Sequence, residues 1–339
     1  MIYLIESLII LVISVFLIFV CNKNLILIHN AGEPHQNFVK SRLTPLIGGI
    51  IIFIFILLDI QNLSFLYFFP FLILITGVLS DSRKIISAYL RLFVQFILVV
   101  LFIDFYEMAV DKTRIYILDN FLENYFLSVL FTTFCVLIII NGTNFIDGSN
   151  LLAIGYFLIL EAVFIILNFR GLNVELILFS NTLIIVLLII FFLNALNKLY
   201  LGDGGSYLLG FIYSFKCISL YLLNPNISPF FIILILWYPA FEILFSILRK
   251  LNFNKSPIKP DSNHLHQLIY FALIKKISNN TLRNNLVGII INLFNLIIIS
   301  FSLIDIYNTQ FQIILFIFSI SVYVFIYIRL LRIKLRKIF

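Results

Sequence analysis

The chain has 339 residues, of which 62% are hydrophobic and only 12% charged, and its formal net charge is +7. A water-soluble core does not need that much apolar surface, so the composition excludes an ordinary soluble protein and indicates a polytopic, all-α integral membrane protein. The three cysteines, Cys21, Cys135 and Cys217, lie far apart and match neither a disulfide nor a metal-binding pattern. No nucleic-acid partner is expected.

Taken in chain order, the apolar runs predict a bundle of about 11 transmembrane helices. The run that starts at Ile2 has neither a basic start nor a small-residue cleavage site, so we expect a retained span rather than a signal peptide. The expected spans cover residues 2–20, 45–61, 63–79, 89–106, 124–141, 149–168, 172–193, 206–223, 229–247, 285–304 and 310–329. The whole chain, 1–339, is expected to form a single transmembrane domain.

Lysine and arginine are distributed unequally between the connections of these spans. If the N-terminus lies outside, 19 of the 23 basic residues fall on the cytoplasmic side, in the connections 21–44, 80–91, 142–148, 194–205 and 248–284 and in the tail from residue 329. Cytoplasmic loops are enriched in basic residues, so the distribution predicts an N-out, C-in topology. A basic tail would also lie well against anionic lipid headgroups, which is its structural alternative.

Five polar motifs interrupt the apolar sequence, and the predicted topology places all of them on the cytoplasmic side. In chain order they are Lys40-(x3)-Thr44-Pro45, Gly77 to Asp81, Asn141 to Asn150, Leu201 to Ser206, and Asp261 to His266. The acidic connection 104–123 falls on the other side and carries no comparable turn or histidine, so we expect a solvated loop there. The five motifs are expected to meet at one membrane face.

The residue types in these motifs share a chemical use. Aspartates that face an oxygen-rich ligand are the usual way to hold Mg²⁺, or Mn²⁺ in its place, beside phosphate oxygens. Glycines around Asp203 let the backbone approach a bulky anion, and the start of the following helix offers free N–H groups to phosphate. Each motif alone also has an ordinary explanation: a polar hairpin at 141–150, a helix-start turn at Asp203, and exposed polar side chains at His264 and His266.

In this order and spacing the motifs resemble those of the polyprenyl-phosphate N-acetylhexosamine-1-phosphate transferases, the family of the bacterial undecaprenyl-phosphate GlcNAc-1-phosphate transferases. The likeness extends from about His35 to His266 and includes Pro239-(x2)-Glu242 with Arg249. Three positions depart from the family pattern. Ser80 stands where a second aspartate is common, Asn150 replaces a usual aspartate, and Gln267 ends the histidine motif.

The resemblance implies an enzyme that transfers a sugar-1-phosphate from a UDP-sugar to undecaprenyl phosphate or another polyprenyl phosphate and releases UMP. The sugar is expected to be a HexNAc, and the reaction is expected to be the first membrane step of cell-surface glycan assembly. The implied location is the bacterial cytoplasmic (inner) membrane, with the active site on the cytoplasmic face. The expected partners are the UDP-sugar, the polyprenyl phosphate and the bilayer, and a homodimer is left open.

The resemblance also implies roles for individual residues. Asp203 is the expected metal ligand, for Mg²⁺ or Mn²⁺. The expected catalytic residues are Asp81, Asp147, His264 and His266, and the expected substrate-binding residues are Lys40, Thr44, Asn141, Asn144, Gly202 and Ser206.

Two other classes of function stay open. A lipid-linked glycan transporter would also be polytopic, but transporters place ionisable residues in mid-span, where only Glu161, Lys216 and Glu242 qualify. A catalytically inactive paralogue that acts as a scaffold is the second alternative, and the three departures from the family pattern motivate it.

Overall fold

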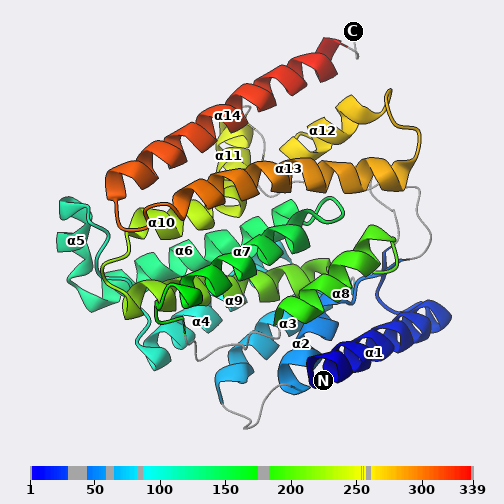
Figure 1. Cartoon of the computed structure of the whole chain (residues 1–339), viewed down its shortest axis with the longest axis horizontal. Helices are drawn as coiled ribbons and strands as arrows, with labels where there is room; N and C mark the ends of the chain where they lie inside the picture. The colour runs from blue at the N-terminus through cyan, green and yellow to red at the C-terminus, as the bar shows by residue number, and fades with distance from the viewer. Residues whose placement is uncertain are drawn as a thin grey trace.

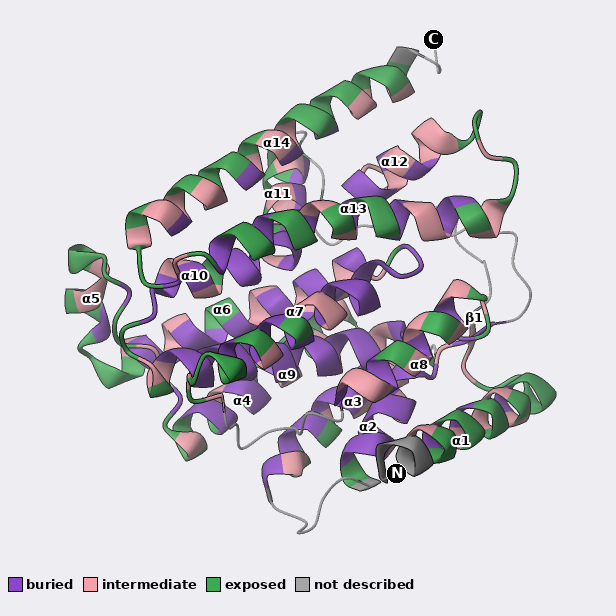
Figure 2. Ribbon diagram, viewed as in Figure 1, coloured by how far each residue is buried: buried purple, intermediate pink, exposed green. Residues whose placement is uncertain are grey.

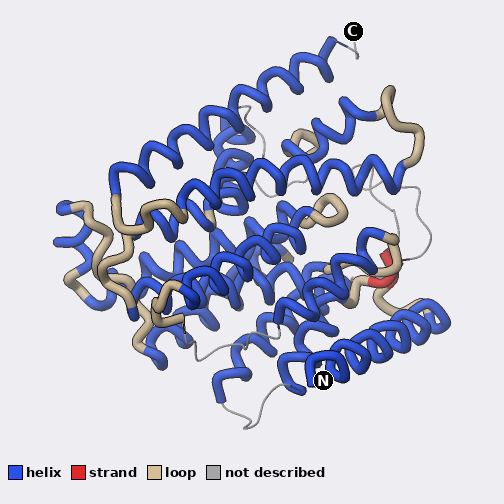
Figure 3. The backbone as a smooth tube through the Cα atoms, in the orientation of Figure 1, coloured by secondary structure: helices blue, strands red, loops and turns tan. Residues whose placement is uncertain are grey.

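The computed structural model describes residues 2–29, 44–58, 65–82, 87–174, 183–252, 254, 256 and 261–336. These residues fold as a bundle of helices, to which one short antiparallel strand pair is added (Figure 3). In that pair Ile28 lies opposite Pro45 and His29 opposite Thr44. The fold is therefore helical, as the composition predicts.

The elements are labelled in chain order in Figure 1. The helices are α1 (Ile2–Asn24), α2 (Gly48–Leu58), α3 (Phe68–Asp81), α4 (Ala88–Tyr106), α5 (Tyr116–Leu122), α6 (Tyr125–Ile146), α7 (Leu152–Phe169), α8 (Leu183–Ala195), α9 (Gly202–Leu223), α10 (Pro229–Ile235), α11 (Trp237–Asn252), α12 (Leu265–Leu273), α13 (Asn280–Ser302) and α14 (Thr309–Arg336). Strands β1 (Ile28–His29) and β2 (Thr44–Pro45) lie between α1 and α2, and a short 3₁₀ helix, η1 (Phe65–Tyr67), precedes α3.

Within the described ranges, seven helices are long and apolar enough to cross a membrane, or eight if α10 and α11, which meet at a 74° bend, form one span. Three shorter apolar helices, α2, α3 and α8, coincide with three further expected spans. The structure thus shows a polytopic helical membrane protein. The total of eleven spans and the orientation of the bundle stay predictions.

Two helix boundaries differ from expectation in a way that matters for the polar motifs. α6 continues to Ile146, so Asn141 and Asn144 lie on a helix, whereas the sequence predicted that the span would end at 141 and a loop would follow. α9 begins at Gly202 and not at 206, so Asp203 lies in its first turn. In both places helical hydrogen bonds satisfy backbone groups that a loop at the edge of a bilayer would leave to water.

α9 lies at the centre of the bundle and is almost entirely buried, whereas α1 and α14 form opposite edges that expose many apolar side chains (Figure 2). Phe102 of α4 packs on the α9 residues Phe211 and Phe215, with ring centroids 5.1 and 4.2 Å apart. α3 also runs very close to α9: the two helices approach so closely at Gly77 that a methyl group there would overlap the backbone of Gly204. This approach brings the end of α3 to the start of α9.

The two ends of α9 mark opposite faces of the bundle. Its 22 residues rise about 33 Å, which is close to the thickness of the apolar core of a bilayer. Beyond its last residue, Arg114 donates hydrogen bonds to the carbonyl oxygens of Asn226 and Tyr307 and so joins the connection 104–123 to two loops at that end. The acidic connection therefore lies at the opposite end from the start of α9, as the sequence predicts.

Candidate active site

Three aspartates from separate parts of the chain meet at the start of α9. Asp81 ends α3, Asp147 directly follows α6, and Asp203 lies in the first turn of α9. The first N–H groups of a helix have no partner within that helix and favour negative charge beside them. Asp81 accepts the backbone N–H of Asp203 at 3.1 Å and that of Gly204 at 3.2 Å. The Asp147 carboxyl lies close enough to the N–H of Gly202 for that group to favour its charged form and so oppose the rise of its pKa.

Three side chains from neighbouring helices bind the Asp203 carboxylate. Its Oδ2 atom accepts from the Ser80 hydroxyl at 2.6 Å and from Arg91 Nη1 at 2.9 Å, and its Oδ1 atom accepts from Asn144 Nδ2 at 2.6 Å. Arg91 also donates to Ser80, and Asn144 donates to Ser206 at 3.1 Å. The Asp203 side chain is still 29% exposed, so it remains accessible to a ligand. The residues Asp81, Asp147, Asp203, Asn144 and Ser206 are called the acid cluster below.

The carboxyl groups of the acid cluster disfavour one another's negative charge. Burial, followed by the charge of Asp203, raises the pKa of Asp81 to about 8 despite the hydrogen bonds it receives from the start of α9. Burial, together with the charges of Asp203 and Asp81, also raises the pKa of Asp147 well above its ordinary value. Among the described residues, Arg91 is the cation that forms an ion pair with the cluster. The cluster therefore favours the binding of additional positive charge.

The chemistry of these donors fits a divalent cation that prefers oxygen ligands. In the part of the chain that the structure describes, no three carboxylate, imidazole or thiol side chains are arranged to bind one metal ion. Mg²⁺, however, is commonly held by one or two carboxylates together with waters and substrate phosphates. Asp203 with one neighbouring carboxylate would therefore be a sufficient contribution from the protein.

A loop from much later in the chain lies beside the acid cluster. The rings of His264 and His266 are stacked with centroids 5.7 Å apart, and His264 packs edge-on against Phe145 at 5.2 Å. The Nε2 atom of His266 touches Gly148, where any side chain would overlap the ring. Burial, followed by the charge of His264, lowers the pKa of His266 to about 4, so this ring is neutral near pH 7. The two imidazoles thus border the turn that carries Asp147.

α11 and α14 hold the first of these histidines through a buried carboxylate. Glu242 of α11 is only 1% exposed, and it accepts from His264 Nδ1 at 3.0 Å, from the backbone N–H of Leu265 at 3.3 Å and from the Tyr323 hydroxyl of α14 at 2.6 Å. A carboxylate only accepts hydrogen bonds, so His264 carries a proton on Nδ1. Glu242 therefore orients the His264 ring from its Nδ1 side, and Asp261 Oδ1 lies 3.3 Å from Nε2 on the other side.

Two basic side chains fix the loop just before the histidines. Arg249 of α11 forms an ion pair with Asp261 at 2.7 Å and also donates to the carbonyl oxygen of Asn263. Lys334, near the end of α14, donates to the carbonyl oxygen of Ser262 and to the side chain of Asn263, both at 2.7 Å. The loop is thus held by side chains from two helices, α11 and α14.

Two of the three positions that depart from the family pattern have structural partners outside the acid cluster. Asn150 donates to the side-chain oxygens of Asn197 at 2.5 Å and Asn285 at 2.9 Å, and so joins the α6–α7 turn to the α8–α9 turn and to α13. Gln267 accepts the backbone N–H of His264 at 3.1 Å and helps to cap α12. The third departure is Ser80, which donates to Asp203 and accepts from Arg91. A carboxylate at this position would add to the repulsion among the aspartates of the acid cluster.

The remaining predicted substrate-binding residues lie at two depths. Gly202 lies at the acid cluster with φ +76°, a backbone conformation that side chains other than glycine rarely adopt. Asn141 lies one turn deeper in α6, where it donates to Gln95 of α4 at 3.0 Å and to the carbonyl oxygen of Leu137 at 3.0 Å. The structure therefore places Gly202 with the carboxylates, whereas the amide nitrogen of Asn141 is bound between α6 and α4.

The motif before α2 is described only in part. Thr44 is buried and donates to the carbonyl oxygen of Asn197, in the turn before α9, at 3.3 Å. Lys40 lies outside the described residues, so its expected contact with phosphate stays a prediction. Thr44 thus supports the turn that leads to Asp203.

Sequence reasoning missed Arg91 as part of this site, because it was counted only as a signal of membrane orientation. A signal was nevertheless present, since Arg91 lies in the first turns of the helix that follows the Asp81 motif, and both belong to the same short connection, 80–91. Lys334 was missed for the same reason. Nothing in its local sequence relates it to Ser262, which it reaches only through packing of α14 against α12.

Comparison with known proteins agrees with this geometry. Residues 63–221, which include all three aspartates of the acid cluster, match glycosyl transferase family 4. A "Probable undecaprenyl-phosphate N-acetylglucosaminyl 1-phosphate transferase" of Bacillus subtilis is 27% identical over 73% of this chain and 71% of its own. An "Undecaprenyl-phosphate alpha-N-acetylglucosaminyl 1-phosphate transferase" of Haemophilus influenzae is 27% identical over 72% of this chain and 71% of its own. A protein of the same description from Salmonella typhi is 28% identical over 77% of this chain and 76% of its own. Over residues 63–221, slightly less than half of its length, the chain is therefore similar to glycosyl transferase family 4.

Proposed function

We propose that this protein transfers a HexNAc-1-phosphate from a UDP-HexNAc to undecaprenyl phosphate or another polyprenyl phosphate. The observation that carries the proposal is the meeting of Asp81, Asp147 and Asp203 at one end of the bundle, beside the histidine loop. The names of the similar proteins support the acceptor and the type of reaction. The choice of UDP-HexNAc as donor rests on this similarity and on the motifs.

In the proposed reaction, an oxygen of the polyprenyl phosphate forms a bond to the sugar-bearing β-phosphorus. The bond from that phosphorus to the oxygen bridging the two phosphates breaks, and its electron pair leaves with UMP. Negative charge spreads over the phosphoryl oxygens in the transition state, so positioning and nearby cations supply most of the catalysis. The crowding of carboxylates at the start of α9 is the arrangement expected of a site that works with a bound cation.

Asp203 would hold Mg²⁺ or Mn²⁺, which when bound neutralises phosphoryl charge. Asp147 and Asn144, which lie beside Asp203, would bind the nucleotide or assist at the metal. Asp81, whose raised pKa lets it exchange a proton near neutral pH, would orient the acceptor phosphate or take its proton. The imidazoles of His264 and His266 would contact the phosphates of the donor.

The membrane arrangement proposed with this function has eleven spans, with the N-terminus outside and the C-terminus inside. Its support is the distribution of basic residues, together with the overlap of every expected span with an apolar helix. This orientation places the acid cluster at the cytoplasmic face of the bacterial inner membrane, where soluble UDP-sugars are available.

One observation weighs against the transporter alternative. Glu161 and Lys216 lie in mid-span, but they are buried and form an ion pair with each other, to which Tyr213 adds a hydrogen bond. Such a pair neutralises its own charge and offers no free ionisable group to a passing substrate. The scaffold alternative is weakened because the acid cluster retains three carboxylates.

The test is a membrane assay with purified protein, polyprenyl phosphate, Mg²⁺ and a panel of radiolabelled UDP-HexNAc donors. Label should enter the organic phase with at least one donor, and that donor identifies the sugar. Asp203→Asn should abolish transfer and leave the melting temperature nearly unchanged, whereas Asp111→Asn, in the acidic connection at the opposite end, should have no effect. Normal transfer by Asp203→Asn would refute the metal assignment, and no transfer with any donor would refute the proposed function.

A further inference from the structure

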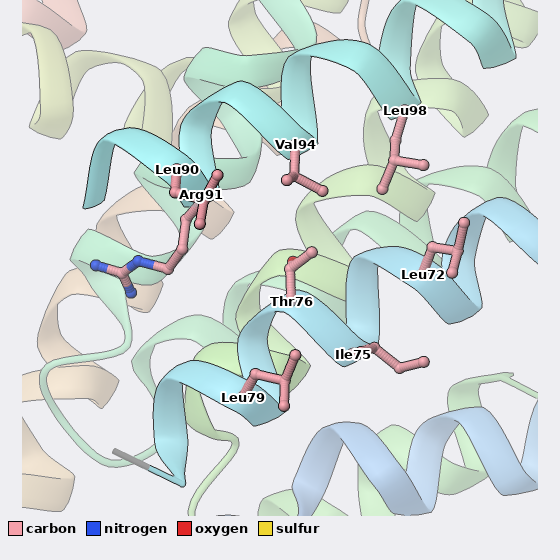
Figure 4. A pocket seen from close by; sticks show the side chains of 8 residues that line it. All are labelled: Leu72, Ile75, Thr76, Leu79, Leu90, Arg91, Val94 and Leu98. Carbon is pink, nitrogen blue, oxygen red and sulfur yellow. The ribbon is translucent and has the colours of Figure 1, made fainter. Parts of the chain in front are cut away.

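Two groups of polar contacts support the acid cluster. α3 and α4 supply the first, through Ser80 and Arg91, and in Figure 4 the guanidinium group of Arg91 points away from the apolar side chains between these two helices. α13 supplies the second, although none of its residues takes part in the proposed reaction and it lies outside the matched residues 63–221. Its contacts reach both turns that carry the chain to or from the acid cluster.

Four small or polar residues of α13 share one face of the helix. They are Thr281, Asn285, Gly288 and Asn292, and their spacing of i, i+4, i+7 and i+11 places them in one row. Polar side chains in a membrane-spanning helix are typically bound to a neighbouring helix. These four residues are called the α13 stripe below, and their partners show what the stripe holds.

The α13 stripe binds the turn between α6 and α7, directly after Asp147. A methyl group on Gly288 would overlap the carbonyl oxygen of Asn150, so the backbone of this turn packs directly on α13. Asn292 donates to the carbonyl oxygen of Leu151 at 2.9 Å. Leu151 has φ +64°, a conformation that residues other than glycine keep only where their surroundings hold it. The stripe therefore fixes the shape of the turn.

The same row binds the turn between α8 and α9, which leads to Asp203. Asn285 donates to the carbonyl oxygen of Ala195 at 2.9 Å, and Asn197 donates to the hydroxyl of Thr281 at 2.6 Å. Asn197 also has a left-handed backbone conformation, with φ +53°. Both turns are thus bound to one face of a single helix.

Asn285 is the residue of the stripe that binds both turns. Its Nδ2 atom donates to the Ala195 carbonyl, which can only accept, so its Oδ1 atom faces Asn150 and accepts from it at 2.9 Å. The side chain at position 150 therefore has to donate, which an asparagine does and an ionised aspartate does not. The asparagine found here, in place of the aspartate usual in the family that the sequence resembles, thus matches Asn285.

We infer that the α13 stripe, with Asn285 at its centre, is a positioning element that holds the turn after Asp147 and the turn before Asp203 at a fixed separation. The inference rests on the proposed function, because it says how the carboxylates of that site are kept in place. Asn285 acts through Asn150 and the Ala195 carbonyl and not on the reacting groups. Phosphoryl transfer depends mainly on positioning, so a loosened stripe should slow transfer more than it weakens substrate binding.

A double-mutant cycle tests this route. Asn285→Ala should lower kcat by about tenfold or more and change the KM of either substrate by less than about threefold, as expected when catalytic groups shift by a fraction of an ångström. The Asn150→Ala/Asn285→Ala double variant should be no slower than the slower single variant, because the two side chains act through one hydrogen bond. Effects that multiply in the double variant would overturn the route.

The aspartate usual in the family gives a second test. Asn150→Asp keeps the shape of the side chain but cannot donate to Asn285, so kcat should fall about as far as in Asn150→Ala. If Asn150 were instead a catalytic group lost from this chain, the aspartate would raise kcat. A kcat that rises or stays at the wild-type value in Asn150→Asp would overturn the inference.

Hydrogen exchange of the purified protein needs no turnover and therefore separates this inference from the proposed function. In Asn285→Ala, peptides covering 148–155 and 194–203 should both exchange faster than in the wild type. Arg170→Gln is the control, because it removes a hydrogen bond to the carbonyl of Leu303 at the other end of α13, and it should leave both peptides and kcat unchanged. Faster exchange in only one of the two turns of Asn285→Ala would show that Asn285 does not couple them.

A milder variant keeps the test decisive if Asn285→Ala does not fold. Thr281→Val removes one hydroxyl group and should speed exchange of 194–203 and lower kcat, and wild-type values of both would overturn the inference. If the wild type transfers no sugar but both turns respond to Asn285→Ala, the proposed function fails and the coupling through α13 stands.

Discussion

Replacing Glu242 with glutamine should separate the chemistry of the histidine loop from its folding. The carboxylate accepts three hydrogen bonds, from His264, Leu265 and Tyr323, in a buried position. A glutamine has nearly the same shape, and its amide oxygen can keep the bonds to His264 and Leu265. Its NH₂ group then faces the Tyr323 hydroxyl, which can rotate to accept. All three contacts therefore survive in neutral form.

The size of the effect follows from this exchange of charged for neutral bonds. A hydrogen bond to a charged group contributes about 1.5–3 kcal/mol, and a neutral one about 0.5–1.5 kcal/mol. Three such exchanges lower the free energy of unfolding by about 3 kcal/mol, which a folded membrane protein of this size should tolerate. The activity should fall further, by about 10- to 100-fold, as is typical when a carboxylate that orients a functional histidine is lost.

The assay compares Glu242→Gln with Tyr323→Phe. Both variants lose stability at the same carboxylate, so both should melt at a lower temperature in detergent. Only Glu242→Gln removes the carboxylate that holds His264 Nδ1, with Asp261 still at Nε2, and only this variant should lower kcat/KM for the UDP-sugar and change its pH dependence. If the two variants lose stability equally and both retain wild-type kcat/KM, then Glu242 does not position a functional histidine.

Three further predictions concern other contacts. Gly148→Ala should reduce transfer by about tenfold or more, because its methyl group displaces the His266 ring and a misplaced group costs activity steeply, whereas Ser149→Ala beside it should stay active. His266 has a folded-state pKa of about 4 and an ordinary one near 6.5, so the unfolded chain binds its proton first as the pH falls. The melting temperature should therefore drop between pH 6.5 and 4, with a smaller drop in His266→Gln; equal slopes would contradict the buried neutral ring. Lys216→Met leaves the Glu161 carboxylate buried and unpaired and should cost about 3–5 kcal/mol of unfolding free energy, most of which Glu161→Gln in the same chain should restore. A double variant no more stable than the single one would show that the pair is not coupled.

The convergence of the motifs was predictable from sequence because membrane topology sorts polar segments onto two faces. Asp81, Asp147 and Asp203 end or begin apolar runs that the predicted orientation places on the same side, and the structure brings all three to the start of α9. The long apolar helices were predictable for the same reason. Hydropathy, however, measures the apolar part of a helix and not its hydrogen-bonded length, so the polar turns at Asn144 and Asp203 were assigned to loops although they are helical.

The partners of these residues could not be predicted from sequence, because they depend on which helices touch. Asn150 and Gln267 looked like lost catalytic groups, but the first binds Asn197 across the bundle and the second caps its own helix. Arg91 looked like an orientation signal, because a basic residue near a membrane edge has that role in most proteins. Its second role depends on the close approach of α3 and α9, which brings Ser80 and Asp203 to the same guanidinium.

The contact between Lys334 and the loop before His264 has a practical consequence for anyone who fuses, tags or shortens this protein. Lys334, near the end of α14, binds the loop that precedes the two imidazoles, so cargo attached at residue 339 is only a few amino acids from a contact that holds this loop. A reporter inserted in the connection 104–123 would lie at the opposite end of the bundle, away from this loop. The tail of the chain is best left unmodified whenever catalytic rates are to be compared.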